Sequence, residues 1–208
     1  MLHFETVEPD TLRLLRKLMD APCLAGFSLV GGTCLSLRHG HRMSVDLDLF
    51  SVLQFDNEQL KEELANSGFH FSETFYSNRL GLFGYIQGVK VDFVRHHQFP
   101  LLSPIEKNDG IRMFADPDII AMKTSAILRR AVKKDFWDVA ELLKHYTLDD
   151  FVRFYEAKYP DQQLLITVPR ALSYFDEAEN SPAPNCLRSL SWESIKDTIR
   201  KAVREYLA

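Results

Sequence analysis

The spacing of apolar residues is mixed in the first half of the chain and almost purely helical in the second half. Leucines recur at helical spacing in residues 10–20, which predicts a helix. The short apolar run at 27–30 stops at two glycines, the pattern of a buried strand that ends in a tight turn. Residues 33–39 are expected to form one or two helical turns closed by Gly40, and residues 44–50 alternate as a strand does.

Strand signals return after one more helix-like segment. Residues 57–66 have the pattern of an amphipathic helix. Two strand-like runs, 80–86 and 89–94, then flank Gln87 and Gly88, so we expect them to form a hairpin.

Helix signals dominate from residue 116 onward. Residues 116–118 are Asp-Pro-Asp, with the first aspartate as a candidate N-cap and proline at the first helical position. Residues 147–150 have the spacing of a capping box. A loop rich in Pro, Ser and Asn at 177–186 precedes a last helix at 191–206.

These patterns predict an α+β fold with an α/β half over residues 1–115 and a helical half over residues 116–208. The 208 residues are 46% hydrophobic and 26% charged, which is enough apolar sequence for a core of ordinary size. No internal repeat or low-complexity tract is visible.

The composition limits the compartments and the classes of partner that we expect for the protein. The formal net charge is −4, which argues against general nucleic-acid coating but leaves room for a local basic patch. The three cysteines are odd in number and far apart, so neither a disulfide framework nor a zinc site is expected. The first residues lack an apolar signal core and no stretch is long enough to span a bilayer, so we expect a cytoplasmic protein without a membrane partner.

Two carboxylates stand two positions apart in the predicted strand 44–50. Because residues i and i+2 of a strand share a face, Asp46 and Asp48 should project together. The opposite, buried face is expected to carry Val45, Leu47 and Leu49. Adjacent carboxylates repel each other unless a divalent cation binds between them, and oxygen ligands suit Mg²⁺.

A third acid, Asp92, lies in the predicted strand 89–94. If that strand pairs beside the strand of Asp46 and Asp48, the three carboxylates form a cluster able to hold two metal ions. Asp92 could also act as the base for an attacking hydroxyl.

The glycines before this strand supply a second element of chemistry. Gly31 and Gly32 let the backbone pass close to a phosphate, which a Cβ would obstruct. Thr33 would open a helix whose free N–H groups and dipole favour an anion, and its hydroxyl could add a hydrogen bond. Phosphates at the helix start and metal at the neighbouring strand would form one site.

Two blocks of sequence resemble a known enzyme family. Gly-Gly-Thr at 31–33, twelve residues, and then Asp-x-Asp at 46–48 resemble the signature of polymerase-β-like nucleotidyltransferases. The longer stretch GGTCLSLRHGHRMSVDLDLF is similar to the opening of the AbiEii/AbiGii toxin family. A second block, KTSAILRRAVKKDFWDVAELL, resembles that family's downstream Lys, Arg and Lys-Asp-x-x-Asp motifs. The resemblance covers residues 27–145.

The resemblance implies a nucleotidyltransferase with a mixed sheet flanked by helices, whose helical half completes the active-site cleft. It implies NTP and Mg²⁺ as reactants, with two ions expected and Mn²⁺ as an alternative. It also implies nucleotide transfer onto an acceptor, RNA such as tRNA, by a type IV toxin–antitoxin or phage-defence toxin. A separately encoded antitoxin is then a candidate partner.

Functional positions of the family carry over to the matching residues of this chain. The implied metal ligands are Asp46, Asp48 and Asp92, and these acids together with Lys123 form the expected catalytic set. The expected nucleotide-binding set is Gly31, Gly32, Thr33, Arg130, Lys134, Asp135 and Asp138. Lys123 and Arg130 are seven residues apart, which places them on one face of a helix.

Simpler structural roles remain open for several of these residues. Asp46 and Asp48 could be solvent-facing residues of an edge strand. Thr33 could be an N-cap, and Asp135 could cap a new helix with Asp138 in its first turn. His41 and Arg42, which belong to the first block, could position the strand or touch the nucleotide.

Alternative functions also remain open. An enzyme that modifies a small molecule such as an aminoglycoside would share the same core motifs. A non-catalytic nucleotide-binding module that sequesters a partner is a third possibility, although all three acids are present here. The basic run at 129–134 and the charges of the last helix could contact an RNA acceptor or form a solvated surface.

Overall fold

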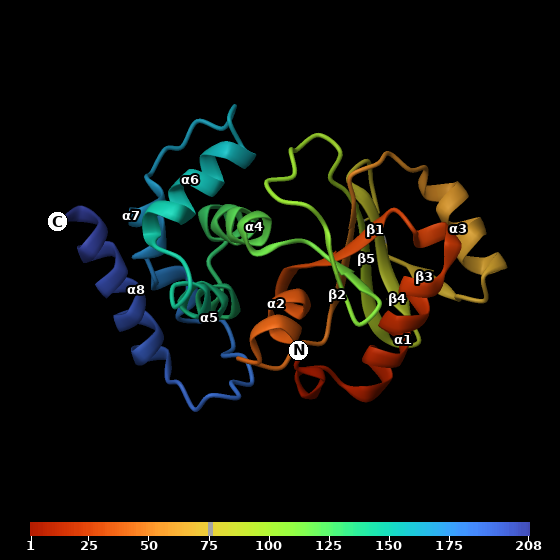
Figure 1. Ribbon diagram of the computed structural model, residues 1–208, viewed down its shortest axis with the longest axis horizontal. Coiled ribbons are helices and arrows are strands. Elements are labelled where there is room, and N and C mark those ends of the chain that lie inside the picture. The colour runs from red at the N-terminus through yellow and green to blue at the C-terminus, as the bar shows by residue number, and fades with distance from the viewer. Residues whose placement is uncertain (75–76) are drawn as a thin grey trace.

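A mixed sheet and a group of helices lie side by side in the computed structural model, which describes residues 1–74 and 77–208 (Figure 1). The strands are β1 (Phe27–Val30), β2 (Leu47–Ser51), β3 (Phe71–Glu73), β4 (Gly81–Ile86), β5 (Val89–Arg95), β6 (Glu106–Asn108) and β7 (Ile111–Met113). The α-helices are α1 (Pro9–Asp20), α2 (Gly31–His39), α3 (Asn57–Asn66), α4 (Asp116–Arg129), α5 (Lys133–Leu142), α6 (Leu148–Lys158), α7 (Val168–Leu172) and α8 (Trp192–Leu207). The predicted α+β class is confirmed.

The strands form one sheet in the order β3-β4-β5-β2-β1-β7-β6. β2 pairs in parallel with β5 and β1 in parallel with β7, whereas the other neighbours are antiparallel. The predicted hairpin of β4 and β5 is present, with positive φ at both Gln87 and Gly88, as a two-residue hairpin turn requires. β2 therefore lies in the middle of the sheet, where it is paired on both sides.

Several boundaries differ from the sequence prediction. α2 begins at Gly31 rather than Thr33, so the helix follows β1 directly. β2 begins at Leu47, two residues after Val45, and Val45 is 60% exposed instead of buried. Leu47 and Leu49 are buried as expected because both lie inside the paired strand. The alternation of polar and apolar residues continues beyond the first paired residue of β2. The neighbouring strands decide where the pairing begins, and the local pattern does not show them.

The helical half packs around α4, which contacts α5, α6 and α7. α6 begins with the predicted capping box, in which Thr147 and Asp150 satisfy each other's backbone N–H groups. α8 begins after Ser191, whose side chain accepts a hydrogen bond from the Ser194 N–H. Among the described residues, no helix combines the length and apolar character needed to cross a bilayer.

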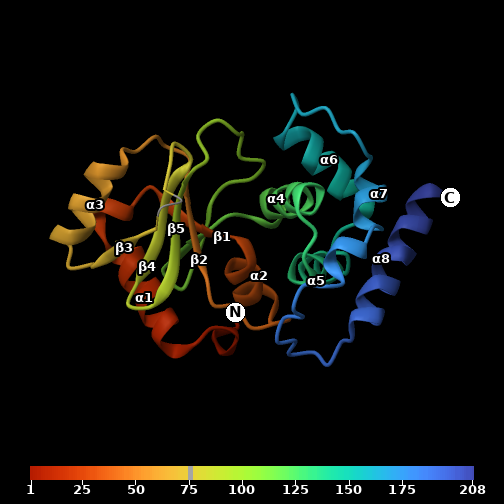
Figure 2. The ribbon, with the colours of Figure 1, turned by 180° about the vertical axis from the view of Figure 1, so that it is seen from behind.

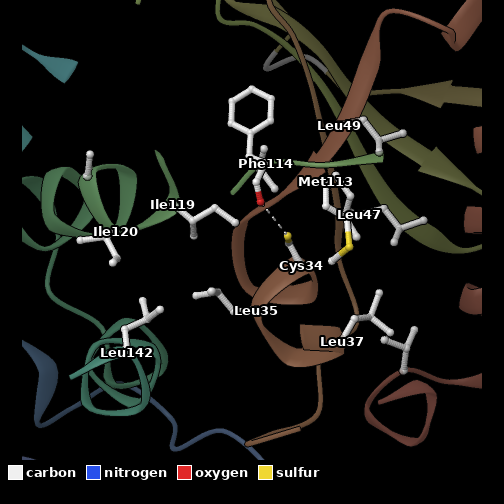
Figure 3. Packing of buried hydrophobic residues seen from close by; sticks show 14 of the residues in the cluster. Cys34, Leu35, Leu37, Leu47, Leu49, Met113, Phe114, Ile119, Ile120 and Leu142 are labelled. Atoms are coloured by element: carbon white, nitrogen blue, oxygen red, sulfur yellow. Dashed lines mark hydrogen bonds between the residues drawn. The ribbon is translucent and has the colours of Figure 1, made fainter. Parts of the chain in front are cut away.

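α2 connects the two halves. In both ribbon views it lies between the sheet and α5 (Figures 1 and 2). Leu35 of α2 is fully buried in the same cluster as Ile119 of α4 and Leu142 of α5 (Figure 3). Cys34 Sγ lies 3.7 Å from the carbonyl oxygen of Phe114 and donates to it (Figure 3). One continuous core thus reaches from the sheet into the helices, and it holds the start of α2 near both.

A buried ion pair fastens the segment between β5 and β6 to the helices. Lys158 Nζ lies 2.6 Å from Asp118 Oδ1, and both side chains are fully buried. The ammonium group also donates to the carbonyl oxygen of Pro100, while Asp118 accepts the N–H groups of Leu102 and Ser103. Asp118, in the first turn of α4, therefore ties the connecting segment to α4 and α6.

Candidate active site

Two of the predicted acids face each other on neighbouring strands. β2 and β5 run in parallel, and Asp48 is the register partner of Asp92. Neighbouring strands lie about 4.8 Å apart, and residues in register project to the same face, so the two carboxylates lie side by side. Asp46 stands one residue before β2 and remains partly exposed. We call these three residues the acid cluster.

The acid cluster carries negative charge that its neighbours do not balance. Burial and the charge of Asp92 raise the pKa of Asp48. The ammonium groups of Lys90 and Lys123 oppose this shift without cancelling it. Asp92 is only 8% exposed, and its Oδ1 is buried without a hydrogen-bond partner. A buried orphan oxygen among like charges fits a hard divalent cation such as Mg²⁺ or Mn²⁺.

Lys90 is a neighbour of the acid cluster that the sequence analysis did not single out. It precedes Asp92 by two positions on β5, and its Nζ lies 2.5 Å from Asp92 Oδ2. The spacing of two was the available signal, because it places both side chains on one face of a strand. Lys90 supplies the nearest positive charge to the cluster, and its side chain stays 43% exposed.

Gly31 allows α2 to start against the acid cluster. Its φ is +70°, a conformation that side chains disfavour. A Cβ built on it would collide with Asp48 Oδ2, so the Asp48 carboxylate would have to move aside. The backbone conformation therefore favours glycine here, and glycine also leaves the Asp48 carboxylate in place.

Gly32 makes room for an arginine rather than for an open pocket. A Cβ at this position would lie 2.2 Å from Arg42 Nη2. Arg42 is 3% exposed and forms two parallel hydrogen bonds with Asp138, from Nε to Oδ1 at 2.7 Å and from Nη2 to Oδ2 at 2.9 Å. His41 Nε2 lies 2.7 Å from the same Oδ1. His41 and Arg42 therefore anchor the segment before β2 to α5.

The side chain of Thr33 faces the interior. Thr33 is 1% exposed, and its hydroxyl hydrogen-bonds the carbonyl oxygen of Asp46 and lies 2.9 Å from Ser44 Oγ. This hydroxyl positions Asp46 through the backbone, which differs from the expected contact with phosphate. The expected N-cap role is also absent, because Val30 is the N-cap residue of α2.

Lys123 of α4 lies between two aspartates of α5. Its Nζ is 2.8 Å from Asp135 Oδ1 and 2.6 Å from Asp138 Oδ2. Burial opposes the charged form, but the two carboxylates prevail and raise the pKa of Lys123. Burial would raise the pKa of Asp138, yet Arg42 and Lys123 hold it well below its usual range. We call Arg42, Lys123, Asp135 and Asp138, with His41, the buried charge network.

Burial changes the expected role of Asp138. The residue is fully buried, and both carboxylate oxygens are engaged by Arg42, His41 and Lys123. Direct contact with a nucleotide, as expected from the sequence, does not fit this environment. The structure instead shows Asp138 holding the residues around it in place.

A cavity of about 200 Å³ opens between the sheet and the helical half. It is lined by Val30, Gly31, Asp48, Phe50, Ile119, Met122, Lys123, Ala126, Arg130 and Asp135. Five predicted site residues thus meet around one space, contributed by β2, the start of α2, α4 and α5. The acid cluster reaches this cavity through Asp48, so metal ligands and cationic side chains border the same volume.

Two further cations lie at the margin of this site. Arg130 is the C-cap residue after α4 and has an extended backbone, so it does not share a helical face with Lys123 as predicted. It still lines the cavity, because the chain turns there before α5. Lys134 Nζ lies 3.8 Å from Asp46 Oδ2, which brings the start of α5 to the acid cluster.

The chain is similar to a known protein family and to a curated protein along most of its length. The family described as "Nucleotidyl transferase AbiEii toxin, Type IV TA system" matches residues 13–207. An uncharacterised protein of Aquifex aeolicus (strain VF5) is 31% identical over 199 residues, covering 93% of this chain and 94% of that protein.

Solved structures show the same fold at low identity. A putative nucleotidyltransferase from Helicobacter pylori has a TM-score of 0.57 at 17% identity, covering 97% of this chain and 99% of that one. MenT4, a nucleotidyltransferase toxin from Mycobacterium tuberculosis H37Rv, has a TM-score of 0.59 at 14% identity, covering 92% of this chain and 81% of that one.

The sheet order and these structural neighbours show that the chain has the polymerase-β-like nucleotidyltransferase fold. Within that class, the chain belongs to the AbiEii family of nucleotidyltransferase toxins of type IV toxin–antitoxin systems, because the family matches almost its whole length.

Proposed function

We propose that this protein transfers NMP from an NTP to an RNA acceptor, such as a tRNA, in a reaction that needs Mg²⁺. The observation that carries the proposal is the parallel pairing of β2 and β5, which sets Asp48 beside Asp92 next to the Gly31 turn. The proposed working units are the core, residues 1–115, and the helical half, residues 116–208, which closes the cavity above the acids.

The acid cluster would hold the divalent cations, with Asp46, Asp48 and Asp92 as ligands. Two Mg²⁺ ions, or Mn²⁺, would neutralise charge that builds up on the phosphates during in-line transfer. Asp92 brings a buried oxygen without a protein partner, which is what a metal ligand offers. Lys90 Nζ lies 2.5 Å from Asp92 Oδ2. When a metal ion binds this oxygen, the Lys90 side chain would turn away toward the solvent.

Cations from the helical half would bind the triphosphate. Lys123 lines the cavity and is held in position by Asp135 and Asp138. Arg130 lines the same cavity from the exposed end of α4. The N–H groups at the start of α2 favour an anion beside Gly31, because helix N-termini carry partial positive charge. The nucleotide would thus lie between the sheet and α4.

An RNA acceptor is supported by the positive rim of the site. Arg129, Arg130 and Lys134 follow one another at the junction of α4 and α5, and Lys90 lies on the sheet side. This local charge contrasts with the net charge of −4 of the whole chain. A polyanion would be drawn to the rim and repelled elsewhere. As in other type IV systems, a separately encoded antitoxin would counter the activity.

The direct test is incubation with each labelled NTP, total RNA and Mg²⁺. The wild-type protein should label RNA, and Asp48→Asn should reduce the rate about 10³-fold, because a lost metal ligand removes several kcal/mol of transition-state stabilisation. Asp161→Asn, at an exposed position far along the chain, is the matched control and should keep full activity.

Other outcomes of this assay would point elsewhere. Labelling of an aminoglycoside in place of RNA would favour a small-molecule nucleotidyltransferase. NTP binding that is equally tight with and without Mg²⁺, combined with no transfer to any RNA, would favour a non-catalytic nucleotide-binding module.

A further inference from the structure

A second group of metal-ligating side chains lies away from the acid cluster. His39 is the last residue of α2, Glu141 belongs to α5, and His145 follows α5 by one turn. One ligand atom from each of the three residues lies within 4.8 Å of the others. Glu141 and His145 are four residues apart, so they extend from the same side of the helix end. The two imidazole rings stack with their centroids 5.2 Å apart.

The inner part of this group is buried and incompletely bonded. Glu141 is 2% exposed, and neither its Oε1 nor His39 Nε2 has an aligned hydrogen-bond partner. Asp116 Oδ2 lies 3.2 Å from His39 Nε2, and Arg188 Nη1 lies 2.9 Å from Glu141 Oε1. Lys144 Nζ, at 2.6 Å, pairs with the other carboxylate oxygen, Oε2. His39 Nε2 and Glu141 Oε1 therefore have charged neighbours within 3.2 Å but no well-aligned hydrogen bond.

The donor types differ from those of the acid cluster. Two imidazoles and one carboxylate suit Zn²⁺ and neighbouring transition metals, whereas an all-oxygen set suits Mg²⁺. Tetrahedral zinc with bonds of about 2.0–2.1 Å places its ligand atoms about 3.4 Å apart. His145 is half-exposed and lies beyond the end of α5, so it can move inward by the distance this requires, about 1.4 Å at most. Its exposure also leaves the site open to solvent for metal entry.

We propose that His39, Glu141 and His145 form a second metal site, specific for Zn²⁺ or a similar transition metal, with the fourth position left to water. α2 starts at Gly31 beside the acid cluster, and α5 starts next to Asp135, which holds Lys123. Both helices end at the His/Glu group. This group lies about 12 Å along the axis of α2 from the first residue of that helix. The metal joins the far ends of these two helices and so fixes the helical half against the core.

Arg188 is the competitor of the metal. Its guanidinium lies against Glu141 Oε1 and also donates to the carbonyl oxygen of His39. A metal ion bound to Oε1 would compete with this contact, because two cations at one carboxylate oxygen repel each other. Removing the guanidinium should therefore strengthen metal binding, whereas an ordinary ion-pair cluster would simply lose a partner.

The test is Co²⁺ binding by the full-length protein in excess Mg²⁺, added to fill the proposed site at the acid cluster. Co²⁺ replaces Zn²⁺ and reports its coordination by visible absorption. We expect one Co²⁺ per chain, with the spectrum of a four-coordinate site that Zn²⁺ abolishes. His145→Ala should weaken binding by at least the ~10–100-fold seen for the loss of an outer-ligand partner. His70→Ala, another exposed histidine, is the matched control and should bind as the wild type does.

Arg188→Ala gives the second, opposite change. It should raise Co²⁺ affinity and increase the rise in Tm that the metal produces. No Co²⁺ bound by the wild type and by Arg188→Ala, or equal binding by wild type and His145→Ala, would overturn the proposal. Because the readouts are binding, spectrum and Tm, the result does not depend on whether the protein transfers nucleotides.

Discussion

Two groups of ionised side chains lie on either side of one cavity, and their surroundings are opposite. In the acid cluster, Asp48 and Asp92 repel each other, and the ammonium groups of Lys90 and Lys123 do not cancel the resulting rise in the pKa of Asp48. In the buried charge network, Arg42 and Lys123 between them reach both oxygens of Asp138. At this cavity, the balanced charge of the network holds the structure together, and the unbalanced charge of the acid cluster indicates a ligand.

Residues that stand together in the family motifs have different roles in the structure. Asp138 and Gly32 belong to the two blocks of sequence that resemble the family, but they serve the arginine that anchors β2. Asp48 and Gly31 belong to the same blocks and border the cavity. A motif therefore contains both the groups that would touch the substrate and the groups that hold them in place.

The largest expected effect comes from breaking the buried charge network. Asp138→Asn leaves Arg42 and Lys123 buried with too little negative charge, so we expect the free energy of unfolding to fall by about 3–5 kcal/mol. Urea denaturation monitored by circular dichroism measures it. Asp46→Asn, in the acid cluster and partly exposed, is the comparison and should change stability by less than about 0.5 kcal/mol. Equal losses in the two variants would remove the distinction.

An intermediate effect is expected at the glycine that borders the acid cluster. Gly31→Ala must adopt φ near +70° and meets Asp48 Oδ2, so it should cost about 1–2 kcal/mol from the backbone alone. It should also abolish Mg²⁺-dependent stabilisation, because the displaced carboxylate no longer meets Asp92. Thermal unfolding with and without Mg²⁺ measures both effects. Gly26→Ala, where the nearest atom is 3.5 Å away, is the control and should behave as the wild type.

The smallest effect is a difference in how the two groups respond to pH. The pKa of Asp48 is raised by burial and by Asp92, so its contribution to stability is present at low pH and is lost as pH rises through the raised value. The pKa of Asp138 is lowered by Arg42 and Lys123, so its contribution is present above the usual aspartate range and is lost on acidification.

Mg²⁺ should therefore stabilise the wild type more as pH rises, and Asp48→Asn should remove that trend. Unfolding curves collected over a pH series, with and without Mg²⁺, would show it. A Mg²⁺ effect in the wild type that is constant with pH would argue that Asp48 is not a ligand.

Local patterns in the sequence were sufficient for much of the fold. Periodicity of 3.6 or 2 residues follows from the backbone geometry of each element, and turn and cap residues act on their immediate neighbours. The hairpin of β4 and β5, the capping box of α6 and the last helix could therefore all be predicted. The same reasoning placed Asp46 and Asp48 close together before any partner strand was known. It was wrong for Val45, since the ladder ends before that residue.

Residues brought together over long separations could not be predicted in this way. The bond between Arg42 and Asp138 spans 96 residues, and the choice of the strand beside β2 sets Asp48 against Asp92. Lys90 and the His39, Glu141 and His145 group became visible only when the elements were packed.

By itself, the sequence determined the class of fold, the run of acids and glycines, and the family to which they belong. Tertiary structure alone decided which charges are balanced inside the protein and which remain open to a ligand. The physical reason is that element type depends on neighbours along the chain, whereas charge balance depends on burial and on partners that pairing and packing bring from far away.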